Sequence, residues 1–123
     1  MKKITLLFML LLVRIQLNAQ SVVINEIITS NAAVITDDDG SYEDWVELYN
    51  TSASPINLAG YGLTDLASNP YLWVFPEYWM EPGEHLLIWC SDKNRTDINF
   101  PLHTNFKISS GGESITLTDN NGV

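Results

Sequence analysis

The chain has 123 residues, of which 46% are hydrophobic and 17% are charged, and its 15 acidic residues outnumber 6 lysines and arginines to give a net charge of -9. This composition is typical of one globular domain and excludes both a disordered acidic tail and a second core of normal size. The excess of acid opposes binding to a nucleic-acid backbone, which needs clustered lysine and arginine. The single cysteine excludes an intrachain disulfide and any zinc site built from several cysteines.

The N-terminus has the pattern of a secretory signal peptide. Two lysines precede an apolar run over residues 4–13, and Ala19 is a small residue at a plausible cleavage point. The run is well short of the ~20 apolar residues that span a bilayer, which argues against a membrane anchor. We therefore expect a cleaved signal over residues 1–19 and an exported domain over residues 20–123 that is secreted, periplasmic or at the cell surface.

Cleavage of this signal would also change the charge. Lys2, Lys3 and Arg14 would be removed, so that three basic residues would remain against 15 acidic ones, a net charge of -12. Such a surface repels nucleic acid and anionic lipid headgroups and suits cations or a basic partner.

Short runs rich in β-branched and aromatic residues, separated by turn residues, follow the signal. In one of them Trp45 and Tyr49 alternate with aliphatic residues, as in a strand with one solvated face. The run that contains Cys90 is the most continuously apolar and is a candidate central strand, in which we expect this cysteine to be buried as a small hydrophobe. Seven runs indicate an all-β sandwich or barrel. They cover residues 21–28, 44–50, 61–65, 71–75, 85–91, 106–109 and 114–119.

Several short motifs occur along the chain in a specific order. They are Ile-Asn-Glu-Ile at 24–27, Asp-Asp-Asp-Gly at 37–40, Asp-Trp-Val-Glu-Leu-Tyr-Asn at 44–50, Ile-Asn-Leu-Ala-Gly-Tyr-Gly-Leu-Thr-Asp at 56–65, Pro-Gly-Glu-His at 82–85, His-Thr-Asn-Phe-Lys-Ile-Ser at 103–109 and Gly-Glu-Ser-Ile at 112–115. Taken together, this ordered set resembles the lamin tail domain in its exported bacterial form, across essentially the whole mature chain.

The resemblance implies an immunoglobulin-like β-sandwich with no required disulfide, in agreement with the strand pattern and the single cysteine. It also implies a non-catalytic module, which in exported bacterial proteins is often joined to enzymes or adhesive domains. In nuclear lamins the domain is an interaction surface, and nucleic-acid contact is a property of that group. The net charge of -12 opposes nucleic-acid binding by this chain.

The long loop over residues 29–43 contains the densest acidic cluster. Calcium prefers six to eight oxygen ligands, and consecutive acids before a glycine turn supply several of them. The sequence therefore offers a candidate calcium site, although the spacing of helical calcium loops does not fit. The alternative is a solvated turn in which aspartate and glycine serve the backbone geometry. The candidate ligands are Asp37, Asp38, Asp39 and Glu43.

Aromatic residues are concentrated between positions 71 and 80. We expect Trp73 and the earlier Trp45 to pack in the core, and Tyr78 and Trp79 to be exposed in a turn before Glu81. Exposed tyrosine and tryptophan rings stack on sugars or anchor protein interfaces.

Catalytic motifs are weak in this sequence. Glu26 and Glu47 could act as a carboxylate pair in glycoside hydrolysis, but we expect both on a solvated strand face. His85 and His103 lack a metal-ligand spacing, and neither Ser109 nor Ser110 lies in a nucleophile motif. We therefore expect no enzyme.

Two turn signals lie near the C-terminus. Residues 110–113, Ser-Gly-Gly-Glu, predict a hairpin turn, and Asn121-Gly122 predicts another with a partner strand after it. Because the lamin tail pattern continues with a further strand, we expect a sandwich that lacks its last strand and self-associates through an open sheet edge.

The function that we expect is protein interaction, adhesion or a structural role, and the alternative is an accessory carbohydrate-binding module.

Overall fold

The computed structural model describes residues 19–111 and 114–123, and every regular element among them is a β-strand. The predicted signal peptide lies almost entirely outside the described residues, as does part of the predicted turn over 110–113. The described residues include no helix long and apolar enough to cross a bilayer. The strands are β1 (Val22–Ile28), β2 (Asp44–Asn50), β3 (Ile56–Asn57), β4 (Gly62–Thr64), β5 (Trp73–Val74), β6 (Trp79–Met80), β7 (His85–Cys90), β8 (Leu102–His103) and β9 (Thr116–Thr118).

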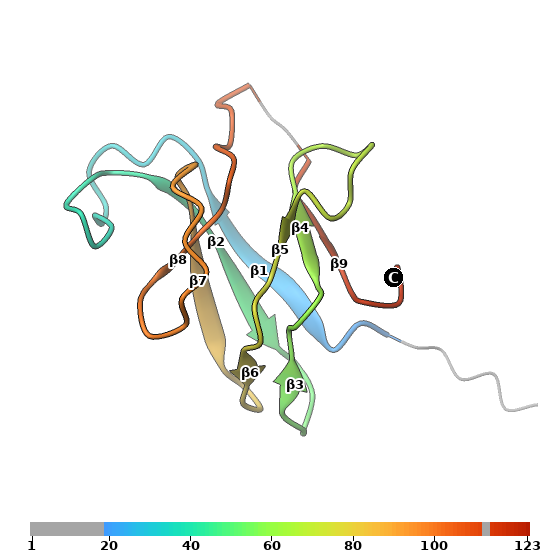
Figure 1. Ribbon diagram of the computed structural model, residues 1–123. Helices are drawn as coiled ribbons and strands as arrows, with labels where there is room; N and C mark the ends of the chain where they lie inside the picture. The colour runs from blue at the N-terminus through green and yellow to red at the C-terminus, as the bar shows by residue number, and fades with distance from the viewer. Residues whose placement is uncertain (1–18, 112–113) are drawn as a thin grey trace, which may run out of the picture.

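The strands form two main sheets with the hydrophobic core between them. The larger sheet has the order β1-β2-β7-β8, in which only the β7–β8 pair is parallel, and the smaller has the order β5-β4-β9. A short β3–β6 ladder lies at the lower end of the molecule (Figure 1). Side chains from both sheets, such as Leu48, Ile88, Leu63 and Leu117, meet in one buried cluster. The all-β sandwich prediction is therefore confirmed.

One of the predicted strands is wrong, and three short strands were not predicted. Residues 106–109 form no strand, and their one ladder contact is an isolated bridge between Lys107 and Ser91. Their alternating pattern arises because Phe106 and Ile108 point into the core. β9 pairs with β4 instead of with this segment. The sequence also missed β3, β6 and β8, because two-residue strands are too short to show an alternating pattern.

The two faces of the larger sheet differ in what covers them. On the inner face, Val46, Leu48 and Ile88 belong to the core. On the outer face the strand register places Trp45 opposite Trp89, Glu47 opposite Leu87 and Tyr49 opposite His85. The predicted alternation along β2 is confirmed.

Trp45 and Trp89 are nearly fully buried although they lie on this outer face. They are 7% and 5% exposed, and neither belongs to the core cluster between the sheets. The prediction that Trp73 packs in the core is correct, whereas Trp45 is buried outside it. Another part of the chain must therefore cover the outer face at this pair.

The remaining local predictions concern Cys90 and the last turn. Cys90 is 1% exposed and belongs to the core, as expected. The backbone turns after β9, where Gly122 donates to the carbonyl of Asp119 and has a φ of 85°. A positive φ of this size is the reason that glycine occupies the position.

Candidate functional site

The loop over residues 29–43 is ordered by its own polar side chains. The carboxylate of Asp37 accepts hydrogen bonds from the backbone amides of Asp39 and Ser41, at 3.0 and 2.9 Å. Gly40, with a φ of 79°, closes this turn by donating to the carbonyl of Asp37. Nearer the start of the loop, the buried side chain of Asn31 donates to two backbone carbonyls. The acidic triplet is therefore held on a rigid turn.

Basic side chains that follow β7 neutralise this triplet. The ammonium of Lys93 bonds Asp37 and lies 2.8 Å from Asp39. The guanidinium of Arg95 bonds Asp38 at 3.0 Å and Asp39 at 2.6 Å. We call Asp37, Asp38, Asp39, Lys93, Arg95 and His103 the ion-pair cluster. Glu43, the fourth predicted calcium ligand, lies apart from it and pairs with Lys107 at 3.4 Å.

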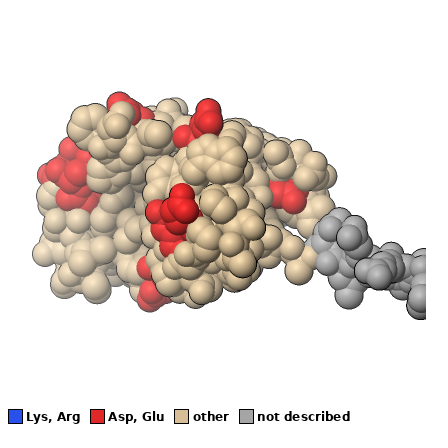
Figure 2. Space-filling view, turned by 90° about the horizontal axis from the view of Figure 1, so that it is seen from below, with Lys and Arg blue, Asp and Glu red and all other residues tan. Residues whose placement is uncertain are grey.

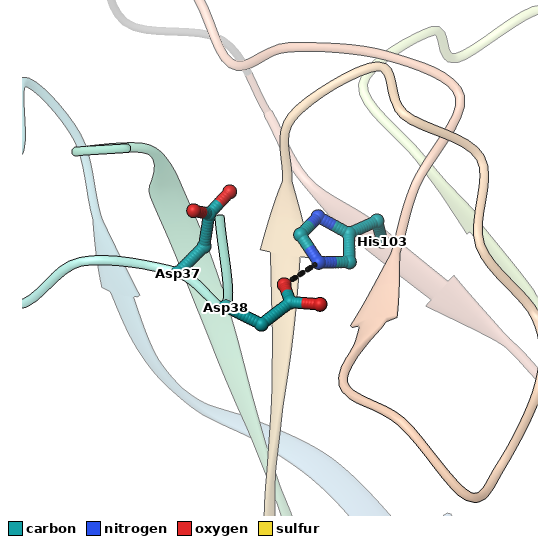
Figure 3. Close-up of side chains that lie close together, drawn as sticks. All are labelled: Asp37, Asp38 and His103. Carbon is teal, nitrogen blue, oxygen red and sulfur yellow. Dashed lines mark hydrogen bonds and ion pairs between the residues drawn. The ribbon is translucent and has the colours of Figure 1, made fainter. Parts of the chain in front are cut away.

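His103 connects the triplet to the larger sheet. Its Nε2 atom lies 2.7 Å from Oδ1 of Asp38, and its Nδ1 atom lies 2.7 Å from the hydroxyl of Ser91. Figure 3 shows the Asp38 carboxylate directed at the imidazole ring. Because a carboxylate only accepts, the ring donates to Asp38 from Nε2. The ring also stacks on Trp89, so the loop that carries Asp38 is bonded to a residue that packs on the buried tryptophan pair.

The charges of this cluster shift several pKa values. Burial alone would raise the pKa of Asp37. The hydrogen bonds from Lys93 and from two backbone amides together outweigh this effect, so the pKa is lowered overall. Bonds from Arg95 and Lys93 lower the pKa of Asp39 to about 2. Burial alone would lower the pKa of Lys93. The bonds to Asp37 and Asp39 outweigh this effect and raise the pKa overall. These shifts favour the charged forms of Asp37, Asp39 and Lys93.

The predicted calcium ligands can be compared with what calcium requires. Asp37, Asp38 and His103 each place a ligand atom within 4.8 Å of the others. Imidazole nitrogen is a poor ligand for calcium, and Lys93 and Arg95 already bond the carboxylate oxygens. The residues therefore fit calcium poorly, since the ion would have to displace both basic side chains. Calcium binding stays a prediction.

The same geometry bears on the catalytic alternative. Ser91, His103 and Asp38 form a hydrogen-bonded chain like that of a hydrolase, but Ser91 and His103 are 4% and 0% exposed. A nucleophile must reach its substrate, so the burial of Ser91 indicates a structural role.

Glu26 and Glu47, the other candidate catalytic residues, lie directly opposite each other on the outer face of β1 and β2.

Tyr78 and Trp79 differ in exposure and do not lie in a turn. Trp79 begins β6, pairs with Asn57 of β3, and is 55% exposed. Its indole Nε1 donates to Oε1 of Glu77 at 3.2 Å. Tyr78 points the other way, packs partly against the core, and donates to Glu84 at 3.2 Å. Burial and Glu84 raise its pKa. Trp79 is thus the exposed member of the pair.

Sequence reasoning did not find the basic half of the ion-pair cluster. Lys93 and Arg95 were counted only as charges, and Ser91 carries no motif. One signal was present, because two of the three basic residues that follow position 20 stand two positions apart. The sequence does not reveal that this pair faces an acidic triplet more than fifty positions away.

One comparison with known proteins identifies a family. The chain matches the Lamin Tail Domain family over residues 16–123. This is a family of non-catalytic immunoglobulin-like domains, in agreement with the all-β sandwich and the immunoglobulin-like prediction. No curated protein and no solved structure matches the chain.

Proposed function

Because the chain belongs to the lamin tail domain family, we propose that it acts as a non-catalytic module for protein interaction, adhesion or a structural role at the cell surface. The sandwich is a rigid support for exposed side chains, and the burial of its Ser91–His103 hydrogen bond supports a non-catalytic role. The hydrogen-bonded Ser91–His103 pair is buried, whereas Trp79 and Glu77 are exposed.

The exposure of Trp79 is the observation that carries the proposal. A tryptophan side chain that is 55% exposed on a paired strand keeps a large apolar surface in water. The hydrogen bond to Glu77 fixes the ring orientation, so little conformational entropy is lost when a partner packs against it. Tryptophan is enriched among the residues that dominate binding energy at protein interfaces.

Selection from a phage-displayed peptide library tests this proposal. Peptides enriched on the wild-type domain should lose most of their affinity for Trp79→Ala and keep it for Leu66→Ala. Leu66 is a suitable control because it is 50% exposed and lies in the loop that follows β4, away from β6 in the sequence. Selected peptides that bind both variants equally well would show that Trp79 is not the contact.

Carbohydrate binding is the second candidate, and it rests on the same ring. An indole face stacks on a sugar, and Glu77 beside it is an acceptor for sugar hydroxyls. A glycan array separates the two functions, since a module specific for proteins gives a blank array. Array signals that disappear in Trp79→Ala would establish the carbohydrate function instead.

Export is part of the proposal because an adhesive module acts outside the cytoplasm. It is supported by the basic and apolar order of the first residues and by the small residue Ala19. Intact mass of the protein recovered from the medium or periplasm should give a chain that starts at Gln20. A cytoplasmic pool that keeps the first residue would contradict export.

Self-association through the edge of β9 belongs to the same proposal, and light scattering at several concentrations tests it.

A further inference from the structure

The outer face of the larger sheet is covered at one end and uncovered at the other. The row that contains Trp45 and Trp89 is buried, and Asp38 of the loop over residues 29–43 is bonded to His103 beside it. The side chains of the next two rows are half-buried or exposed among the described residues. We call these two rows the open face. They consist of Glu26, Glu47 and Leu87 in one row and of Val23, Tyr49 and His85 in the other.

Two glutamates with the same charge lie opposite each other on the open face. Glu26 and Glu47 are direct cross-strand partners in the β1–β2 ladder. Opposite positions with like charges destabilise a sheet. The amide of Asn25 donates to one oxygen of Glu47 at 2.8 Å, but no ion pair involves either glutamate in the part of the chain that the structure describes. The pair is therefore an unneutralised anionic position.

Apolar and aromatic groups surround this position. Leu87 is the direct neighbour of Glu47 on β7. In the adjacent row, the rings of Tyr49 and His85 are stacked with centroids 4.5 Å apart and an interplanar angle of 18°. The stack forms a flat platform next to the two carboxylates. A long basic side chain fits this chemistry, because its aliphatic stem packs on apolar surface while its charged end meets carboxylates or a ring face.

The charge of the rest of the molecule favours the same ligand. Lys93, Arg95 and Lys107, the basic residues of the described segments, all bond carboxylates between positions 37 and 43. The other acidic side chains are left without a basic partner there. Figure 2, which views the molecule from the lower end of Figure 1, shows several groups of acidic atoms and no lysine or arginine. This field attracts cations to the uncovered end of the sheet.

We propose that the open face binds a lysine- or arginine-bearing segment of a protein partner, with the charged end of one basic side chain between Glu26 and Glu47. This inference rests on the proposed function and names the chemistry of the partner, at a surface separate from Trp79. The Tyr49–His85 stack and Leu87 contact the aliphatic part of that side chain.

A lysine-rich peptide and its fully acetylated form are the probes. In 150 mM salt, amide chemical shifts of the labelled wild-type domain should change along β1, β2 and β7 with the first peptide only. Glu26→Gln combined with Glu47→Gln should weaken binding about tenfold or more, since each lost charge contact changes affinity by several-fold. The matched control is Asp92→Asn combined with Asp97→Asn, which removes the same charge at exposed positions that follow β7 and should change affinity less than about threefold.

Thermal stability supplies a second measurement on the same variants. Because the glutamate pair is repulsive, Glu26→Gln should raise or preserve the melting temperature while it weakens peptide binding. Loss of binding together with unfolding would contradict this expectation. Equal losses in both double variants would reduce the effect to net charge and overturn the proposal.

Two further outcomes would overturn the proposal that the open face binds a basic segment. One is binding of the acetylated peptide or of a neutral oligosaccharide at these rows. The other is the absence of any chemical-shift change in the wild-type domain when the lysine-rich peptide is added. None of these results affects Trp79, because the library selection with Trp79→Ala measures that surface separately.

Discussion

The imidazole Nε2 of His103 lies 2.7 Å from Oδ1 of Asp38, although the two residues are 65 positions apart. His103 is fully buried on β8, whereas Asp38 belongs to a loop between β1 and β2. The bond therefore fixes the loop onto the outer face of the larger sheet. Lys93 and Arg95 add four further aspartate contacts at the same place, so this attachment is electrostatic in origin.

The ion-pair cluster should make stability depend on acid pH. The pKa of Asp39 is about 2 and that of Asp37 lies below 3.8, so the unfolded chain binds more protons as the pH falls. The stability that these carboxylates supply is complete above about pH 4 and is lost as the pH falls toward 2. Lys93→Met should lower the melting temperature at pH 6, where it leaves the enclosed Asp37 carboxylate unpaired, and this difference should shrink toward pH 2. Lys107→Met is the control, and a difference that does not vary with pH would contradict the assignment.

Calcium should have little effect on the wild-type domain. Lys93 and Arg95 occupy the carboxylate oxygens that the ion needs. We expect no change in melting temperature between micromolar and millimolar calcium, and a calcium-dependent increase once Lys93→Met and Arg95→Met free these oxygens. A wild-type increase that Asp37→Asn and Asp39→Asn remove would instead establish the calcium site predicted from the sequence.

Asn50 should be among the most sensitive polar positions. Its buried amide donates to the carbonyls of Ser54, Met80 and Glu81, and its oxygen accepts from Ser52. Replacement by alanine leaves several polar groups without partners, so Asn50→Ala should cost about 2–4 kcal/mol in a denaturant titration. Asn57→Ala is a milder comparison, because the described contacts of that side chain include one hydrogen bond, which its Oδ1 accepts from the backbone amide of Ala59. Equal costs for the two variants would argue against this role of Asn50.

Gly62 should not tolerate any side chain. A Cβ atom there would lie 2.3 Å from the carbonyl oxygen of Pro70 and 2.6 Å from the ring of Tyr71. Because the nearest atom belongs to the backbone, Gly62→Ala should destabilise the fold by about 3 kcal/mol or prevent folding. Gly111→Ala meets nothing within 4 Å and should leave stability unchanged. Thermal unfolding of the two variants measures this difference.

Cys90 should be unreactive in the folded protein. Burial raises the pKa of its thiol to about 12, so almost no thiolate is present at neutral pH. A thiol reagent should therefore modify it only after denaturant unfolds the domain. Fast modification of the native protein would show that this part of the core opens easily.

The sequence predicted what depends on local pattern. Alternation along β2 and the apolar run of β7 are both encoded within a few neighbouring residues, and both strands form where they were expected. The error at residues 106–109 has the same origin, because Phe106 and Ile108 alternate in burial without forming a ladder. Periodicity reports which side chains are buried and cannot report backbone pairing.

The candidate site was harder to predict because it is made of distant contacts. The acidic triplet was visible in the sequence, but its partners lie beyond six intervening strands. Glu26 and Glu47 were recognised as a carboxylate pair, whereas the bulge in β1 that sets their register is a property of the folded sheet. Trp45 was expected to be buried in the core, but it is buried on the outer face of the larger sheet.

The position of Trp45 and Trp89 gives the domain an optical signal for one loop. The four tryptophans occupy three environments, with Trp73 between the sheets, Trp79 in solvent, and Trp45 and Trp89 buried on the outer face beside the His103–Asp38 bond that holds the loop over residues 29–43. Indole emission shifts to longer wavelength when water reaches the ring. With Trp79 replaced by phenylalanine, the remaining emission is that of enclosed rings, and a red shift that precedes loss of circular dichroism would report detachment of the loop before the sandwich unfolds.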